Sequence, residues 1–331
     1  MKFNEKKNYF PKEKNLYIAI FKVFILYKKM SNDVEVLRKA MEGFGTDEGT
    51  LIKVIGNRSG RQRQQLKAQY KATYGRDLIE DLKKETHGKL EDAFVALFSD
   101  PVEYDADSLR GAMKGIGTTE DTLIEIISSR SPQQLMAIKN CYQQKYGRNL
   151  EDDIKKETHG TLEHILITLL QGRRSTNTVP NQNACAAIAK EIFDSGEAKL
   201  GTDESVFNKY FGTLSPYELV CVAQNYHKMY GHTILDAIEK EFKGDSKKAF
   251  KSIVYATLSP SEYFATRVNE AIKGFGTQDN ILMRVLISRD EIDMPQIKQY
   301  YKQLYGKDMV EAIRNDISGE YQKLMVELCS H

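Results

Sequence analysis

The sequence contains one pattern four times, and this repetition limits the folds that the chain can adopt. Residues 41–46, Met-Glu-Gly-Phe-Gly-Thr, return in related form as residues 113–118 and 272–277, and a variant occupies residues 197–202. A hydrophobic core requires periodic apolar residues, but it does not require a glycine loop and a carboxylate at one constant separation. The repeated pairing therefore predicts a cation site that is used four times. An acid stands forty residues after the glycine that precedes each threonine: Glu85, Glu157, Glu241 and Asp316.

The segments between the glycine loops and the acids have helical periodicity. Leu51, Val54 and Ile55 fall at positions i, i+3 and i+4, and the second and fourth repeats show the same spacing. No segment alternates between apolar and polar residues with a period of two. We therefore predict an all-α fold of four repeats, with about five helices in each.

Helix start and stop signals agree with this prediction. Thr46 precedes two acids, as is typical of an N-cap and a first turn favoured by the helix dipole. Ser131 and Ser215 each begin a capping box with proline at the first helical position. Glycine suits the left-handed conformation that ends many helices, and a Tyr-Gly pair occupies the same register in every repeat.

The repeats also predict the domain boundaries. Residues 171–183 have turn chemistry and no apolar periodicity, so we expect an exposed linker between two halves, each made of two repeats. The expected segments are a variable N-terminal extension (1–30), repeat one (31–99), repeat two (100–171), a linker (172–184), repeat three (185–258) and repeat four (259–331).

Composition restricts the classes of partner. The chain has 331 residues, 41% of them hydrophobic and 28% charged, which is typical of a globular protein. Its four cysteines have no metal-ligand spacing, and no window is long and apolar enough to span a membrane. Residues 1–30 carry a net charge of +6, which leaves −4 on the remainder. An acidic body does not attract nucleic acid or anionic lipid, so a cation must be supplied before it binds a negative surface.

The repeated loop has the chemistry of a calcium site. Calcium takes six to eight oxygen ligands and accepts backbone carbonyls together with carboxylates. Gly43 and Gly45 allow the chain to turn successive carbonyls outward, and Glu85 supplies two further oxygens. One carboxylate in each site predicts weak affinity and one or two open coordination positions, which water or a lipid phosphoryl oxygen could fill.

Other uses of a glycine-rich loop fit less well. The dinucleotide-binding fingerprint requires a third glycine, but Glu48, Glu120 and Asp279 occupy that position. The Gly-Lys-Ser/Thr sequence of a phosphate-binding loop is absent. A single Gly-x-Gly-Thr would be an ordinary junction between helices; four copies, each with a distant acid, favour cation binding.

These motifs resemble those of the annexin family, and the resemblance extends from about Asn32 to Cys329. It implies a curved all-α disc of two halves with Ca²⁺ loops on its convex face. It also implies reversible, calcium-dependent binding to acidic phospholipid membranes by a cytoplasmic protein. The implied metal ligands are Met41, Gly43, Gly45 and Glu85; Met113, Gly115, Gly117 and Glu157; Gly196, Lys199, Gly201 and Glu241; and Ile272, Gly274, Gly276 and Asp316, with a secondary site at Thr118 and Glu120.

The chain departs from the family pattern in two loops. Glu42 stands where a basic residue is usual, and Lys199 replaces the first glycine in repeat three. A further group of polar residues matches positions that line the central hydrophilic channel of the family. We interpret this group as an ion-pair network between repeats two and four rather than as an ion path: Asp105, Glu125, Arg130, Arg284 and Arg289.

The function predicted from sequence is calcium-switched membrane binding without catalysis, because no catalytic set of side chains stands out. The alternative is an interaction scaffold or ion-conducting assembly with reduced lipid binding. Residues 1–30 leave three interpretations open: a tail that binds a partner or the membrane, a signal peptide for secretion, or an upstream extension of a chain that begins at Met30.

Overall fold

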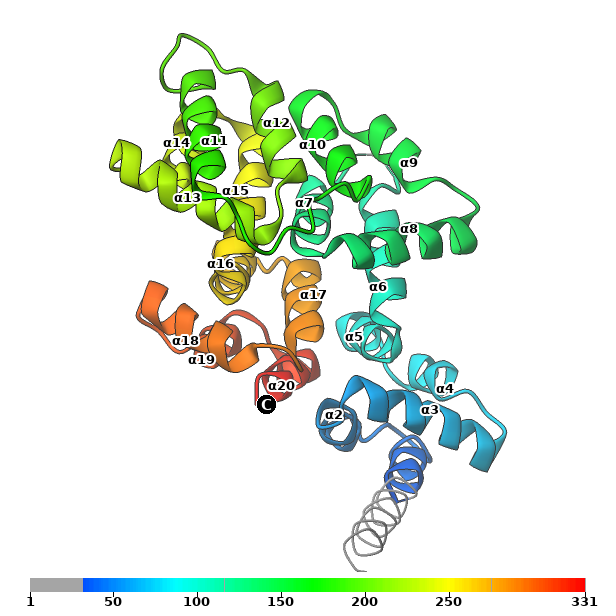
Figure 1. Ribbon diagram of the computed structural model, residues 1–331. Coiled ribbons are helices and arrows are strands. Elements are labelled where there is room, and N and C mark those ends of the chain that lie inside the picture. Colours follow the sequence, from blue (N-terminus) through cyan, green and yellow to red (C-terminus); the bar gives the residue numbers. More distant parts are fainter. Residues whose placement is uncertain (1–31, 116, 275, 331) are drawn as a thin grey trace, which may run out of the picture. The chain divides into compact units, whose positions relative to one another are not determined.

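The computed structural model describes residues 32–115, 117–274 and 276–330, and within these ranges it contains helices and no strands (Figure 1). The predicted all-α class is therefore confirmed. The three interpretations of residues 1–30 concern residues outside the described ranges.

Each repeat consists of five helical segments in the same order. In repeat one they are residues 32–40, α2 (Glu48–Gly56), α3 (Gly60–Tyr74), α4 (Leu78–Glu85) and α5 (Gly88–Phe98). In repeat two they are α6 (Pro101–Ala112), α7 (Glu120–Ser129), α8 (Pro132–Tyr146), α9 (Leu150–Glu157) and α10 (Gly160–Leu170). In repeat three they are α11 (Gln182–Ser195), α12 (Glu204–Thr213), α13 (Pro216–Tyr230), α14 (Ile234–Glu241) and α15 (Gly244–Leu258). In repeat four they are α16 (Pro260–Ile272), α17 (Asp279–Arg289), α18 (Met294–Tyr305), α19 (Met309–Asp316) and α20 (Gly319–Leu328).

The predicted caps delimit the third helix of the repeats. Ser131 and Ser215 form capping boxes with Gln134 and Glu218, in which side chain and backbone groups satisfy one another at the helix start. The glycine of each Tyr-Gly pair has the expected left-handed conformation, with φ of 68°, 64°, 76° and 68° in the four repeats. Local sequence therefore determines where these helices begin and end.

The predicted N-cap at Thr46 is wrong by one residue. Asp47 is the N-cap of α2, and its carboxylate accepts a hydrogen bond of 3.0 Å from the backbone N–H of Thr50. The hydroxyl of Thr46 instead donates to Glu85 at 2.7 Å. Asp47 can cap because its carboxylate reaches the first turn, which leaves Thr46 available for the distant acid.

The described chain forms two compact units that do not follow the repeat boundaries. One unit contains the residues up to Phe98 together with Ile317–Ser330, and the other contains Ser99–Asp316. Helix α20 belongs to the first unit, where it packs against α2 and α5. The contact with α2 is close, because a Cβ atom added at Gly56 would lie 2.8 Å from Cγ of Glu327. The predicted arrangement of the whole as a curved disc of two halves stays a prediction.

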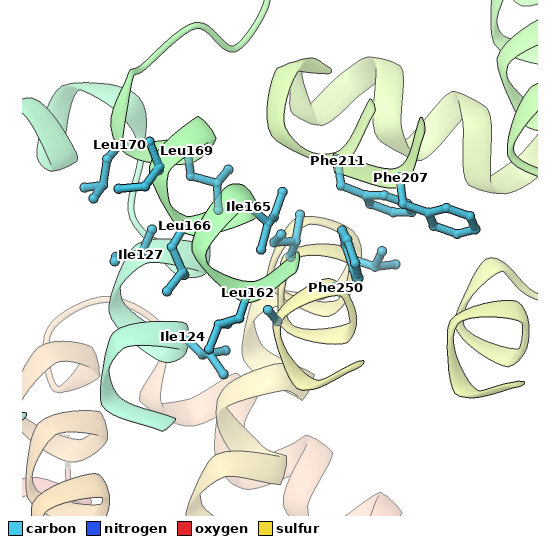
Figure 2. Packing of buried hydrophobic residues seen from close by; sticks show 14 of the residues in the cluster. Ile124, Ile127, Leu162, Ile165, Leu166, Leu169, Leu170, Phe207, Phe211 and Phe250 are labelled. Carbon is cyan, nitrogen blue, oxygen red and sulfur yellow. The ribbon is translucent and has the colours of Figure 1, made fainter. Parts of the chain in front are cut away.

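The core of the second unit forms where helices of repeats two and three meet. Figure 2 shows isoleucines and leucines of α7 and α10 packed near phenylalanines of α12 and α15. The ring centroids of Phe207 and Phe211 lie 6.0 and 5.4 Å from that of Phe250. Fully burying a side chain of this size contributes about 1.5–3 kcal/mol. This apolar contact holds the two repeats together.

The connection between repeats two and three is tied to repeat three. The backbone N–H of Ser175 donates to the carbonyl of Thr213 at 2.7 Å, and the guanidinium of Arg174 donates to the carbonyl of Phe211 at 3.3 Å. Burial of the guanidinium lowers the pKa of Arg174 to about 10. Much of this segment is exposed, as expected of a linker, but these bonds hold its first part against α12.

A buried carboxylate joins repeats two and four. Glu125 of α7 is 1% exposed and accepts hydrogen bonds from Nε of Arg284 at 2.6 Å and from Nε of Arg267 at 3.0 Å. Burial would raise the pKa of Glu125, but the two guanidinium groups outweigh burial, so the pKa lies below its usual value. The predicted network therefore exists at this point, and Arg267 is a member that the sequence analysis missed.

The other predicted members of the network pair within their own repeats. Arg130 forms a bidentate pair with Asp105 at 2.7 and 3.0 Å, both in repeat two. Arg289 pairs with Asp293 at 2.7 Å, four residues along the chain, and its guanidinium lies 4.5 Å from the ring centroid of Phe264. The bridge between the two repeats therefore rests on Glu125.

We expect the substitution Glu125→Gln to lower the free energy of unfolding by about 3–5 kcal/mol, because it removes the counter-charge of the buried Arg284 and one of the two carboxylates that pair with Arg267. Urea denaturation followed by circular dichroism measures this change. Glu80→Gln is the matched control, since Glu80 forms an exposed pair with Lys83 whose loss changes stability by less than about 1 kcal/mol. Equal midpoints for the two variants would contradict a structural role for the buried bridge.

Candidate calcium loops

Each loop begins where the first helix of a repeat ends, and one backbone hydrogen bond closes it. The N–H of the residue after the loop threonine donates to the carbonyl of the residue before the loop. The same bond therefore encloses a six- or seven-residue segment in every repeat. The four pairs are Asp47 to Ala40 at 2.9 Å, Thr119 to Ala112 at 2.9 Å, Asp203 to Ser195 at 2.7 Å and Gln278 to Ala271 at 2.8 Å.

The loop glycines have a backbone conformation that other residues rarely adopt. Gly43 and Gly45 have φ of 101° and 93°, and the matching glycines of repeats two and four also have positive φ. A Cβ atom at these positions would meet no neighbouring atom, so the requirement is conformational rather than steric. Glycine is needed here because the chain must reverse direction within a few residues.

The predicted acids face the loops. Each acid is the last residue of the fourth helix of its repeat and accepts a hydrogen bond from the loop threonine. All four carboxylates are half-buried, and the C-terminal end of a helix dipole adds negative potential there, which favours a cation. The threonine–acid distances are 2.7 Å for Thr46 and Glu85, 2.6 Å for Thr118 and Glu157, 2.5 Å for Thr202 and Glu241, and 2.6 Å for Thr277 and Asp316.

The carbonyls assigned as ligands differ in availability. In repeats one, two and four, no backbone hydrogen bond to these carbonyls occurs within the described part of the chain. In repeat three the carbonyl of Gly196 accepts a bond of 3.0 Å from the N–H of Lys199. The third loop is therefore a tighter turn, with one of its assigned carbonyls already engaged.

Repeat three uses its glycines differently. Lys199 replaces a glycine and, like every other described non-glycine residue, has a negative φ. Gly196 also has a negative φ, of −126°, but a Cβ atom there would lie 3.1 Å from Cδ of Glu241. Glycine at this position lets the carboxylate approach the backbone closely. Only Gly201 retains the positive φ, of 83°, found at the second glycine of the other loops.

The proposed secondary ligands lie together in repeat two. Glu120, the first residue of α7, and Glu157 line a cavity of about 280 Å³ that also includes His159 and Asp245. Thr118 donates to Glu157 within the same region. The arrangement brings a second carboxylate near the principal loop of this repeat.

The set of donor atoms suits a hard cation that is bound with low affinity. Within the described ranges, no three His, Cys, Asp or Glu side chains cluster closely enough to hold a metal ion by themselves. Each loop instead combines one carboxylate with backbone carbonyls, which is the mixture of oxygen ligands that calcium accepts and that zinc and copper do not favour.

The sequence analysis did not assign a role to the apolar residue that directly precedes the last glycine of each loop. Phe44 and Leu200 occupy this position in repeats one and three, and both side chains are fully exposed. Ile116 and Phe275 occupy it in the sequence of the other repeats. Single exposed apolar side chains are common, but an apolar residue at this sequence position in all four repeats was a readable signal of contact with an apolar surface.

Behind each of the first two loops, a buried aspartate binds a tyrosine and an arginine. Tyr70 donates to Asp81 at 2.9 Å, and Arg76 forms a bidentate pair with the same carboxylate at 2.6 Å. Repeat two has the same arrangement around Asp153. Arginine keeps its charge at every physiological pH, so these two pairs are permanent.

Repeat three replaces this arrangement with a titratable one. Ala237 stands where Asp81 does, and Glu197 turns inward from the loop instead. Glu197 accepts bonds of 2.6 Å from Tyr226, 2.6 Å from Nε2 of His232 and 3.0 Å from Lys240. The hydrogen bond to Glu197 raises the pKa of His232 above its ordinary value. The third loop is thus attached to α13 through Tyr226, to α14 through Lys240 and to the connection between these helices through His232.

Comparison with known proteins identifies close likenesses over most of the chain. The sequence profile of the Annexin family matches residues 32–97, 104–169, 188–253 and 263–328. Human annexin A7 is 43% identical over 296 residues, which cover 89% of this chain and 61% of annexin A7, so the chain spans about three fifths of that relative.

Two solved structures share the fold. The structure of annexin III has a TM-score of 0.86 at 35% identity and matches 91% of this chain and 94% of its own. That of calcium-bound annexin (Sm)1 has a TM-score of 0.81 at 31% identity and matches 91% and 90%. In addition, no helix among the described residues has the length and apolar character needed to cross a membrane.

We expect the imidazole of His232 to titrate above pH 6.5 in the folded protein and Glu197→Gln to return its pKa toward that value. Because the folded pKa is raised, the stabilisation by this pair is fully present below about pH 6.5 and is lost as pH rises through the raised pKa. A two-dimensional NMR titration of the histidine ring protons measures both values. An unchanged His232 pKa in the Glu197→Gln variant would show that the contact does not form in solution.

Proposed function

Because the chain belongs to the annexin family, we propose that it binds acidic phospholipid membranes reversibly, when calcium occupies its four loops. The observation that carries the proposal is the same in every repeat: a carboxylate lies within hydrogen-bond distance of a glycine-rich loop whose threonine holds it. The structure of a relative described as calcium-bound supports the choice of cation.

In this proposal the loops and acids supply only part of the coordination shell. Three carbonyls and one bidentate carboxylate provide about five oxygens of the six to eight that calcium takes. The remaining positions face outward, where a lipid phosphoryl oxygen can complete the shell. The proposed ligands are the sixteen loop and acid residues named from the sequence, with Thr118 and Glu120 as a secondary site.

Charge explains why binding would require the cation. Residues 31–331 carry a net charge of −4, so they repel an anionic bilayer when calcium is absent. A bound cation neutralises the carboxylate and attracts the phosphate at the same point. Removal of calcium restores the repulsion, which makes the interaction reversible by chelation.

Exposed loop tips would add an apolar component. The fully exposed side chains of Phe44 and Leu200 would enter the acyl boundary once their loops touch phosphate. Apolar burial contributes about 25 cal/mol for each Å² removed from water. This term stabilises the docked state but does not depend on calcium directly.

The alternative of an ion-conducting assembly receives less support. The carboxylate of Glu125, which matches a channel-lining position, is 1% exposed and is engaged by two guanidinium groups. Such a group holds repeats together and is not available to a passing ion. We also propose that the chain is a binding protein without catalysis and acts peripherally on membranes; a protein partner for residues 1–30 and a cytoplasmic location stay predictions.

The first test replaces the four acids. Glu157→Gln alone should raise the calcium concentration needed for half-maximal sedimentation with phosphatidylserine vesicles, and the combined variant of Glu85, Glu157, Glu241 and Asp316 to their amides should abolish sedimentation. Tethered weak sites gain roughly 10²–10⁴ in apparent affinity from acting together, so losing all four removes that gain.

The matched control changes one exposed acid in each repeat without touching a loop: Glu80→Gln, Asp152→Asn, Asp194→Asn and Glu291→Gln. It removes the same number of negative charges and should bind vesicles at least as well as the unchanged chain. If the four-acid variant sediments at unaltered calcium, the loops are not the calcium sites.

The second test removes the apolar tips. The double variant Phe44→Ala, Leu200→Ala should keep its calcium requirement but bind vesicles about tenfold more weakly at saturating calcium, because less apolar area leaves water on docking. Stopped-flow dissociation from labelled vesicles would locate the loss in the off-rate. Val179→Ala with Ile292→Ala, which shortens two exposed apolar side chains outside the loops, should bind normally. Equal weakening by both double variants would exclude a specific contribution of the tips.

A further inference from the structure

The second compact unit contains a cavity that none of the proposed calcium ligands lines. Its volume is about 540 Å³, and its walls come from α7, α14, α15, α16, α18 and the fourth loop. Pockets of about 300–1,000 Å³ accommodate small-molecule ligands. A ligand of this cavity would therefore be bound by residues other than the proposed calcium ligands.

Basic side chains outnumber acidic ones around this cavity. Three lysines come from two turns of α15, and the remaining basic residues come from α16 and the fourth loop. Five basic residues line the cavity with three carboxylates, so positive charges outnumber negative ones at its wall, although Arg267 and Lys248 also pair with Glu125 and Asp245, which do not line it. The basic residues are Lys247, Lys248, Lys251, Arg267 and Lys273, and the carboxylates are Asp121, Glu239 and Glu270.

The pairing within the cavity leaves cationic groups only partly compensated. Lys247 and Lys251 share one carboxylate, that of Glu239, at 2.7 and 2.8 Å. Both lysines are about one-third exposed, so their charge is held at the wall rather than in bulk solvent. No acidic partner for Lys273 occurs in the described part of the chain. An anion that enters would meet positive charge on two sides.

Arg267 provides an independent sign of an incomplete site. Its Nε donates to Glu125 at 3.0 Å and its Nη1 to Glu270 at 2.5 Å, but its buried Nη2 donates to no protein acceptor. The side chain is 10% exposed. A buried donor without an acceptor costs about 1–3 kcal/mol, more when it carries charge, and a ligand oxygen would remove that cost.

We propose that this cavity binds a small anion bearing phosphomonoester groups, of the size of a phosphorylated polyol. A phosphomonoester dianion suits the basic side chains at the wall, because lysine and arginine are the side chains that most often bind phosphate. Ser252, Thr266 and Gln278 supply hydroxyl and amide groups for the polyol. The phosphate lies against Lys247 and Lys251, and it competes with the carboxylate of Glu239 for these two lysines.

Two sources could present this chemistry: a soluble sugar or inositol phosphate, and the headgroup of a phosphoinositide in a membrane. Lys273 lies within the fourth loop and Gln278 directly follows it, so the cavity is beside the part of the chain that we propose to meet lipid. The site nevertheless needs no calcium, because its donors are cationic side chains and not the loop carbonyls. Its test can therefore be carried out with calcium chelated, apart from the test of membrane binding by the loops.

The experiment is isothermal titration calorimetry of the full chain with inositol 1,4,5-trisphosphate in EDTA at low salt. We expect saturable binding that weakens as salt is added, since the attraction is largely electrostatic. The variant Lys247→Gln, Lys251→Gln removes two of these positive charges and should weaken binding at least tenfold. Glu239→Gln frees both lysines and should tighten it about threefold, a gain that misfolding cannot produce.

A matched control separates the cavity from general charge. Lys155→Gln with Lys228→Gln also removes two lysines of the second unit, both exposed and outside the cavity, and should bind within about twofold of the unchanged chain. The comparison between the two double variants is the readout, because residues 1–30 also carry positive charge. Absence of saturable binding, or equal loss in the two double variants, overturns the proposal.

Vesicles distinguish the two sources. The chain is sedimented in EDTA with phosphatidylcholine vesicles that contain phosphatidylinositol 4,5-bisphosphate. If the Lys247→Gln, Lys251→Gln variant loses sedimentation and the Lys155→Gln, Lys228→Gln control keeps it, the membrane headgroup is a ligand. Trisphosphate binding without vesicle binding supports the site with a soluble ligand as its source. If both double variants still bind the vesicles and the trisphosphate does not bind, the vesicles are bound by another part of the chain. That result rejects the cavity as the site.

Discussion

The hydrogen bond from a loop threonine to the last residue of the fourth helix organises each repeat around its loop. It joins residues 39 positions apart, at 2.5–2.7 Å in the four repeats. Glycines with positive φ turn the loop, the closing backbone bond sets its span, and the helix that ends at the acid aims a carboxylate at it. Each of these parts is ordinary by itself. In the function that we propose, their combination holds a group of oxygen atoms at the surface before a cation arrives, so that little reorganisation is needed on binding.

Two kinds of contact connect the repeats of the second unit. An apolar core joins repeats two and three, where isoleucines and leucines of α7 and α10 pack near phenylalanines of α12 and α15. A buried charged group joins repeats two and four, where Glu125 receives two arginines. Apolar surfaces tolerate sliding and substitution, whereas a buried carboxylate accepts few geometries because every unpaired hydrogen-bonding group is costly. The charged contact therefore specifies how the elements of this unit meet, and the apolar contact supplies most of the stabilisation.

Sequence reasoning predicted what depends on local chemistry. The capping boxes at Ser131 and Ser215 and the Tyr-Gly ends were readable because a few adjacent residues determine them. The register of the loop and its acid was readable because it recurs in four repeats. Thr46 was misassigned because a hydroxyl before two acids has the same local signature whether it caps a helix or bonds a distant carboxylate. Arg267 was missed because its partner lies 142 positions away and no repeat signals the pair.

The inward orientation of Glu197 could have been predicted from the sequence, although it was not. Aligned by repeat, an acid disappears where Ala237 replaces the aspartate of repeats one and two, and another appears at Glu197 in place of a methionine. A loss and a gain of charge at two positions of one repeat indicate a relocated partner for the buried tyrosine. The opposite holds for helix α20, whose place in the first unit depends on packing shape at Gly56 and not on any motif.

The position of helix α20 in the first unit has a consequence for biosynthesis. A chain leaves the ribosome from its N-terminal end, and domains generally fold as units in that order. Helices α2 and α5 precede the second unit in the chain, but the partner that covers them, α20, follows it. Until α20 is translated, the first repeat exposes apolar surface that its own sequence cannot bury, while the whole second unit can already assemble. The first unit is thus begun before the second unit and completed after it.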